Sequence, residues 1–153
     1  MKKLHSDIIS FLKRQGFVIV STLDKDGTPH NSCKGIVEID DKGLVYLLDL
    51  YKTRTYDNIK RHSKLSITAV DEHSFKGYCL KGEAKLIKES DIKDAHLKAW
   101  EEKIIARISK RMIKNLKGEK GPKKHAEVLL PMPEYLIVVE VDKIVDLTPK
   151  NIK

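Results

Sequence analysis

The sequence lacks long hydrophobic runs and a secretion signal. Its apolar runs, of which 17–23 (FVIVSTL) is among the longest, fall far short of the roughly 20 residues that cross a bilayer. Asp7, Lys13 and Arg14 interrupt the first segment of the chain, which argues against a signal peptide. We therefore expect a cytoplasmic protein with no membrane segment.

Cysteine is scarce, with two residues in the chain. Cys33 and Cys79 form neither a CxxC pair nor a disulfide framework, so we expect both thiols to be reduced. Even together with His30 and His73 they match no common zinc spacing. We therefore expect no metal site.

Nucleotide-binding and hydrolase motifs are absent as well. The chain contains no GxxxxGKS/T, GxGxxG or GxSxG, which leaves P-loop, Rossmann and nucleophile-elbow sites without support. It also has no internal repeat and no linker between domains. At 153 residues, with 41% hydrophobic and 34% charged side chains, it is expected to fold as a single domain over residues 1–153.

The net charge of +8 is concentrated in residues 91–124, which carry 11 basic and 5 acidic side chains. We expect a helix over 91–116, capped by Ser90, and a loop over 117–124. One helix face is apolar, with Leu97, Ile104, Ile105, Ile108, Met112 and Leu116. The opposite face is basic, with Lys103, Arg107, Lys110, Lys114 and Lys117.

We interpret the basic face of this helix as solvated, because no aromatic stacking positions interleave with its lysines. The alternative is a non-enzymatic module that binds nucleic acid through helix 91–116. Trp100 lies at the edge of the apolar stripe, where it suits packing or an interface.

The rest of the chain is rich in strands. We expect helices over 1–15 and 53–61, and strands over 17–23, 30–39, 44–48, 65–70, 78–87 and 135–141 or 135–147. Turn signals separate the early strands, and helices do not alternate with every strand, which argues against a parallel sheet. Six antiparallel strands can close into a small barrel that leaves no edge exposed.

The unit over 43–70 concentrates polar groups where a strand ends and a helix starts. Lys52, Thr53, Arg54 and Thr55 supply two cations and two hydroxyls at that point. A helix start offers free N–H groups and a favourable dipole, so the site suits an anion such as phosphate. The alternative is that a threonine caps the helix while Lys52 and Arg54 are solvated.

Five segments in this order resemble the pyridoxamine 5′-phosphate oxidase-like family of FMN-binding split barrels. They are 18–32 (VIVSTLDKDGTPHNS), 44–49 (LVYLLD), 53–67 (TRTYDNIKRHSKLSI), 75–87 (FKGYCLKGEAKLI) and 135–149 (YLIVVEVDKIVDLTP). The resemblance implies a mainly β (α+β) fold, a six-stranded antiparallel split β-barrel with an N-terminal, a short and a long helix.

The resemblance also implies a cofactor site for FMN. Thr53, Arg54 and Thr55 stand where the family holds the FMN phosphate. Many members carry lysine at the place of Thr55, so Lys52 is expected to substitute for that cation. The flavin ring is expected against the second strand and the end of the third, at Asn31, Ser32, Cys33, Asp49 and Leu50.

Family resemblance further implies a homodimer with FMN at its interface and an oxidoreductase that acts on a small molecule, in the manner of a pyridoxamine phosphate oxidase or a flavin reductase. NAD(P)H is an expected electron donor. The segment after residue 149 lacks the longer basic and histidine-containing end of true pyridoxamine phosphate oxidases, which argues against that specific activity. A split barrel that binds deazaflavin or haem is the alternative.

Overall fold

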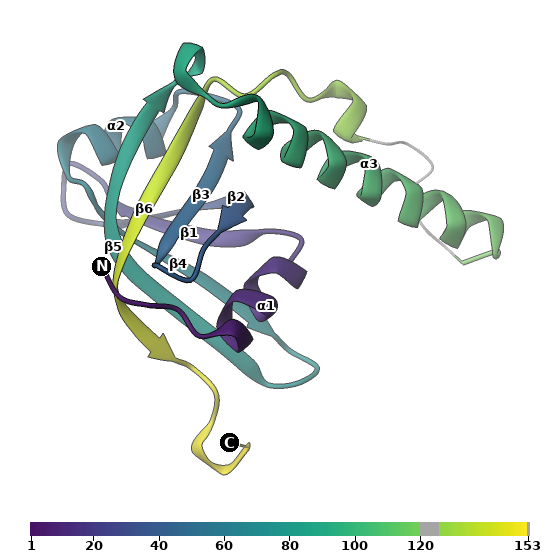
Figure 1. Cartoon of the computed structure of the whole chain (residues 1–153), viewed down its shortest axis with the longest axis horizontal. Coiled ribbons are helices and arrows are strands. Elements are labelled where there is room, and N and C mark those ends of the chain that lie inside the picture. Colours follow the sequence, from purple (N-terminus) through teal and green to yellow (C-terminus); the bar gives the residue numbers. More distant parts are fainter. Residues whose placement is uncertain (120–125, 153) are drawn as a thin grey trace.

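Six antiparallel strands form the body of the protein, and the computed structural model describes residues 1–119 and 126–152. The strands close into a barrel in the order β1-β2-β3-β6-β5-β4 (Figure 1). Their bounds are β1 Val18–Leu23, β2 Pro29–Ile39, β3 Leu44–Asp49, β4 Lys64–Asp71, β5 Lys76–Lys88 and β6 Tyr135–Asp146. The expected six-stranded antiparallel barrel is confirmed, and each strand lies within a few residues of its expected position.

The core lies inside the barrel, as alternation along the strands requires. In β1, Val18 and Val20 are buried, whereas Ile19 between them is 41% exposed. The barrel interior is filled by aliphatic side chains that are fully buried, among them Val45, Leu47, Ile67, Leu80, Ile137 and Val139.

Two short helices lie at opposite ends of this barrel (Figure 1). Helix α1, Ser6–Arg14, buries Ile8, Phe11 and Leu12, and its Phe11 ring meets Tyr78 edge-on at 5.2 Å. Helix α2, Arg54–Arg61, connects β3 to β4 and buries Thr55, Asn58 and Ile59. Burial of one apolar and two polar side chains makes α2 a helix held largely by hydrogen bonds, which matters for the site below.

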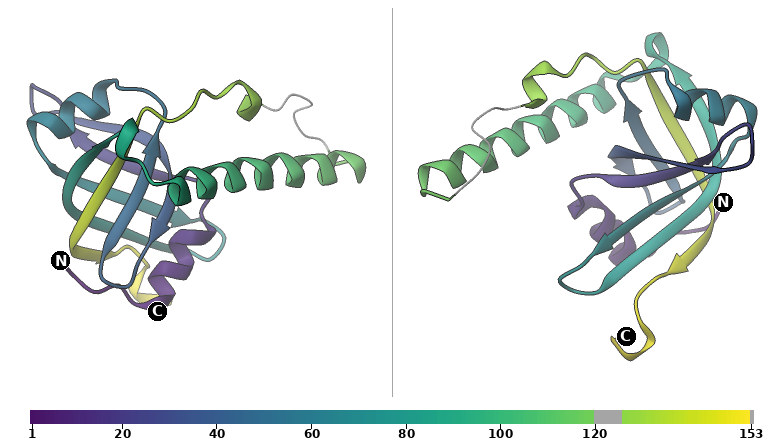
Figure 2. Two further views of the ribbon diagram at one scale, coloured as in Figure 1. Left: turned by 45° about the horizontal axis from the view of Figure 1, so that its top comes forward. Right: turned by 180° about the vertical axis from the view of Figure 1, so that it is seen from behind.

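The long helix α3, Asp94–Leu116, meets the barrel with its first half and extends away from it with its second half (Figures 1 and 2). Its start differs from the expected residue 91, because a separate 3-10 turn occupies Glu89–Asp91. Lys93 takes the N-cap position in place of Ser90. Among the residues of the expected 117–124 loop, 120–124 lie outside the described part of the chain.

The prediction of a packed apolar face and a solvated basic face on α3 is wrong in two respects. Ile105 and Leu116, placed on the packed face, are 62% and 86% exposed. Lys103, expected in solvent, is partly buried and donates to the carbonyl of Ile36 on β2. The reason is that helical periodicity identifies an apolar stripe but not which turns of the helix have a partner.

Another basic side chain of α3 is also engaged within the chain. Arg111 pairs with the buried carboxylate of Glu127 at 2.6 Å, which ties α3 to the following segment.

In the described ranges, no helix is long and apolar enough to span a membrane.

A bulge between β5 and β6 interrupts an otherwise regular ladder. Lys81 faces Lys143, whereas the next residue, Gly82, faces Val141, so Asp142 has no counterpart on β5. A Cβ on Gly82 would lie 2.1 Å from the carbonyl oxygen of Glu140. Glycine is therefore required here by the close approach of two backbones.

We expect Gly82→Ala to lower the free energy of unfolding by about 2–4 kcal/mol, because the new methyl group displaces the β6 backbone. Gly35→Ala is the matched control, since a Cβ on Gly35 on β2 would have no atom within 4 Å. Urea unfolding of the two variants measures the difference. Equal stability of both variants would contradict the steric role of the bulge.

Candidate cofactor site

The start of α2 presents the Arg54 guanidinium to solvent. Thr53 occupies the N-cap position, and its side chain makes no capping hydrogen bond. The Arg54 side chain is 66% exposed, and its Nη1 lies 3.6 Å from Oδ2 of Asp24. The capping alternative therefore does not describe Thr53, and Arg54 is held by one long ion pair.

Thr55 points the other way, into the protein. It is 2% exposed, and its hydroxyl lies 3.0 Å from the hydroxyl of Ser32 on β2. This hydrogen bond connects the first turn of α2 to the second strand, so it joins the segment expected to hold a phosphate to the strand expected to contact a flavin ring.

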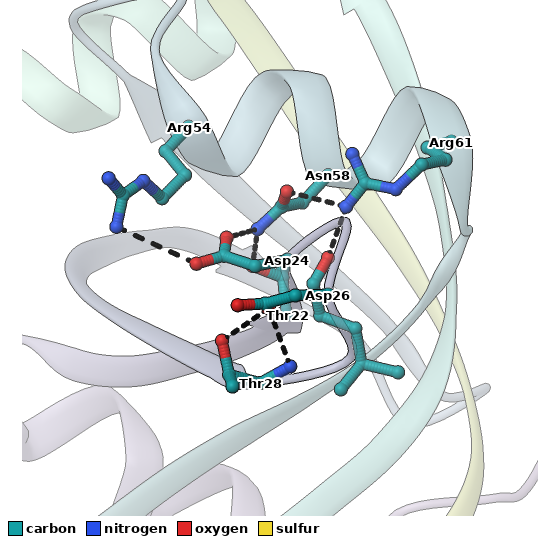
Figure 3. A network of polar contacts seen from close by, with 8 residues as sticks. Thr22, Asp24, Asp26, Thr28, Arg54, Asn58 and Arg61 are labelled. Atoms are coloured by element: carbon teal, nitrogen blue, oxygen red, sulfur yellow. Dashed lines mark hydrogen bonds and ion pairs between the residues drawn. The ribbon is translucent and has the colours of Figure 1, made fainter.

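A polar network fixes α2 against the β1–β2 turn (Figure 3). Asn58 donates to the Thr22 hydroxyl at 3.0 Å and to Oδ1 of Asp24 at 2.8 Å. Arg61 in turn donates to Oδ1 of Asn58 at 2.8 Å. Because Asp24 is held by Asn58 through one oxygen, its other oxygen remains available to Arg54, as the close-up shows.

A hollow of about 480 Å³ lies between this turn and α2. It contains the cations of Lys25, Arg54 and Arg61 and the carboxylates of Asp24, Asp26 and Asp57. Hydrogen bonds from the hydroxyl and then the amide of Thr28 lower the pKa of Asp26. A phosphate that binds Arg54 competes with Asp24 for the guanidinium, across an ion pair that is long and has one exposed partner.

A buried ionic cluster closes the end of β3. Nζ of Lys34 lies 2.6 Å from Oδ2 of Asp49, and both side chains are 9% exposed. The hydroxyl of Tyr135 donates to the same oxygen at 2.5 Å. Burial, and then the bond to this carboxylate, raises the pKa of Tyr135 far above its ordinary value, so the phenol remains a neutral donor.

A second cavity, of about 370 Å³, lies between the ends of β2 and β3 and helix α3. Its wall includes Cys33, Asp49 and Leu50 from the predicted site. Helix α3 adds Trp100, Lys103, Ile104 and Arg107. Burial, and then the charges of Arg107 and Lys13, lowers the pKa of Lys103. The cavity thus combines an apolar wall with the cations of Lys34, Lys103 and Arg107 and the carboxylate of Asp49.

The predicted residues fall into separate groups. Cys33, Asp49 and Leu50 line the cavity beneath α3, and Thr53 and Arg54 line the hollow beside α2, with the Ser32–Thr55 bond linking β2 to α2. Oδ1 of Asn31 accepts a hydrogen bond from the hydroxyl of Ser21 on β1, at 2.7 Å. Lys52 donates its amide to Glu134 at 2.8 Å, and its Nζ lies 5.9 Å from the centre of the Tyr56 ring.

Sequence reasoning missed several residues of this region. Lys34 and Tyr135 complete the cluster around Asp49, and Lys103 and Arg107 bring charge to the cavity. A signal existed for Lys34, because it stands two residues before the apolar Ile36, which is buried, and so shares its inward face of β2. No local signal identified the partner of Lys103, since β2 is distant in sequence.

The family of the chain is shown by its sequence. Residues 4–131 match the model of the family described as Pyridoxamine 5′-phosphate oxidase. This chain belongs to that family, as its sequence resemblance indicated.

Individual relatives are distant. Pyridoxine/pyridoxamine 5′-phosphate oxidase of Shewanella frigidimarina is 27% identical in an alignment of 124 residues, with coverage of 76% of this chain and 58% of that protein. The chain thus spans less than two thirds of the length of this relative.

Solved structures share the fold. HupZ of Group A Streptococcus has a TM-score of 0.66 at 19% identity, with 95% of each chain covered. A pyridoxamine 5′-phosphate oxidase-related, FMN binding protein of Nostoc punctiforme has a TM-score of 0.60 at 15% identity, with coverage of 92% of this chain and 82% of that one. At such low identity the likeness establishes the fold alone.

We expect Asp49→Ala to lower the free energy of unfolding by about 3 kcal/mol, because it leaves the Lys34 cation buried without a partner. Tyr135→Phe removes one donor to the carboxylate and is expected to cost about 1 kcal/mol. Denaturant unfolding of both variants measures these costs. A smaller loss in Asp49→Ala than in Tyr135→Phe would show that the ion pair does not stabilise this end of the barrel.

Proposed function

We propose that this protein binds FMN and is an oxidoreductase that acts on a small molecule. The observation that carries the proposal is the Arg54 guanidinium, which is exposed at the start of α2 and, among the described residues, forms one ion pair, of 3.6 Å with Asp24. A guanidinium, a threonine hydroxyl and helix-start amides together form a good phosphate site. The family of the chain supports the same assignment.

The residues present fit FMN in two parts. Arg54 and Thr53 would hold its phosphate, with Thr55 and Ser32 fixing α2 against β2 behind them. The cavity beneath α3 would receive the ring, with Leu48 and Trp100 as apolar surfaces and Leu50 at its rim. FMN when bound supplies the hydride chemistry, so the protein need not contribute a strong acid or base.

We also propose that the protein is a homodimer with FMN at its interface. A flat ring in an open cavity of this size is buried more completely by a second subunit. Light scattering of the FMN-loaded protein measures this, and the mass of one chain would exclude it.

The absorbance spectrum of the purified protein distinguishes FMN from deazaflavin and haem, which are the alternative ligands of this barrel. A yellow protein that releases FMN on denaturation supports the proposal. A colourless protein that leaves the fluorescence of added FMN unchanged would refute it.

We expect Arg54→Ala to weaken FMN binding by about 2–4 kcal/mol, the cost of a lost charge-assisted contact to phosphate. Riboflavin, which lacks the phosphate, is the matched ligand and should lose little affinity. Fluorescence titration with both ligands measures the contrast. Equal losses for FMN and riboflavin would mean that Arg54 supports the fold through Asp24 instead.

NADPH or NADH is expected to reduce the bound FMN without oxygen, and oxygen or an added acceptor to reoxidise it. The cations of Lys103 and Arg107 in the cavity wall would favour a phosphorylated donor. Stopped-flow bleaching of the flavin absorbance with each nucleotide measures the rate. Reduction no faster than that of free FMN in the same buffer would exclude a nicotinamide-dependent reaction.

A further inference from the structure

A groove of about 370 Å³ crosses the outside of the barrel, apart from the two hollows described above. Its floor is formed by β1, β4, β5 and β6, which are viewed from behind in Figure 2. The strand register places four polar side chains in one row across these strands. Ser21 faces Ser66, Ser66 faces Lys81, and Lys81 faces Lys143. Adjacent members are separated by roughly 5 Å, the spacing between strands.

The two lysines of this row are paired by the bulge. Because the register shifts after Lys81, residue Lys143 comes directly opposite it. Like charges in directly opposed positions destabilise a sheet. Within the described ranges, neither lysine forms an ion pair, although Asp142 also lines the groove. The protein therefore maintains an unfavourable pair at a site built by an obligatory glycine, Gly82.

The other residues that line the groove add further groups that could contact a bound anion. Lys64 and His62 border it, although Lys64 has Glu83 opposite it on β5. The Ser66 side chain is half-buried in the floor. Leu23, which is 40% exposed, provides apolar surface beside these groups. A tetrahedral anion attached to a small organic group would satisfy both lysines and cover this surface.

We propose that this groove binds the phosphate group of a phosphorylated small molecule, with Lys81 and Lys143 as its cationic ligands and Ser66 as a hydroxyl donor. The site is distinct from the start of α2. It reaches the cofactor region through Ser21, which donates to Asn31 at 2.7 Å. The proposal does not require that FMN is the cofactor.

Inorganic phosphate is the probe, with chloride at equal ionic strength as the reference. The titration is followed by amide shifts in the nuclear magnetic resonance spectrum, in Arg54→Ala protein so that the α2 site does not compete. Phosphate should shift the amides of Ser66, Lys81 and Lys143. Lys81→Gln and Lys143→Gln should each weaken binding about fivefold. Lys98→Gln, an exposed lysine on α3, is the matched control and should retain the affinity.

Thermal unfolding provides a second readout that reports on folding. In dilute chloride, Lys143→Gln should unfold at or above the temperature of the unsubstituted protein, because the repulsion with Lys81 is removed. Phosphate should raise the unfolding temperature of the unsubstituted protein more than that of the variant. Unchanged phosphate affinity in the Lys81→Gln/Lys143→Gln double variant, or shifts confined to residues 53–55, would overturn the proposal.

These outcomes are separable from those of the proposed function. Failure of FMN to bind while phosphate still shifts the groove amides would remove the proposed function alone. Normal FMN binding with no phosphate effect at Lys81 and Lys143 would remove the groove alone.

Discussion

Closure of the barrel through the pairing of β1 with β4 is the constraint on which the other features depend. Three residue pairs make this contact, and one of them joins Val20 to Ile67 in the interior. Closure leaves no unpaired strand edge, and it decides which side chains of every strand face inward. Inward-facing side chains form the cluster of Lys34, Asp49 and Tyr135 at one end of the barrel. Outward-facing side chains line the groove that contains Lys81 and Lys143.

Two neighbouring networks at the α2 end of the barrel satisfy buried polar groups in different ways. At the end of β3, Asp49 neutralises Lys34 and accepts the hydroxyl of Tyr135. Beside it, the side-chain amide of Asn58 donates to the Thr22 hydroxyl and to the Asp24 carboxylate. Unpaired polar groups in such places would each cost stability, so both networks stabilise the strands and the helix beside the candidate cofactor site.

The barrel could be predicted from sequence because alternation and turn signals are local, and because the order of five segments is distinctive. The site could be predicted only in part. The strand-to-helix position of Thr53 and Arg54 is a local property, and the structure leaves Arg54 exposed there. Asn31, Ser32 and Cys33 are neighbours in sequence but alternate across β2, so one face of the strand cannot present all three.

The sequence by itself determined the six strands, their antiparallel order, the placement of a basic helix start after β3, and the family. Tertiary structure alone decided that Lys103 bonds to Ile36, that the far end of α3 extends into solvent, and that Lys81 meets Lys143 across a bulge. The physical reason is how far apart in the sequence the interacting residues lie. Periodicity and capping depend on residues a few positions apart, whereas cross-strand register and helix docking depend on partners that only closure of the barrel brings together.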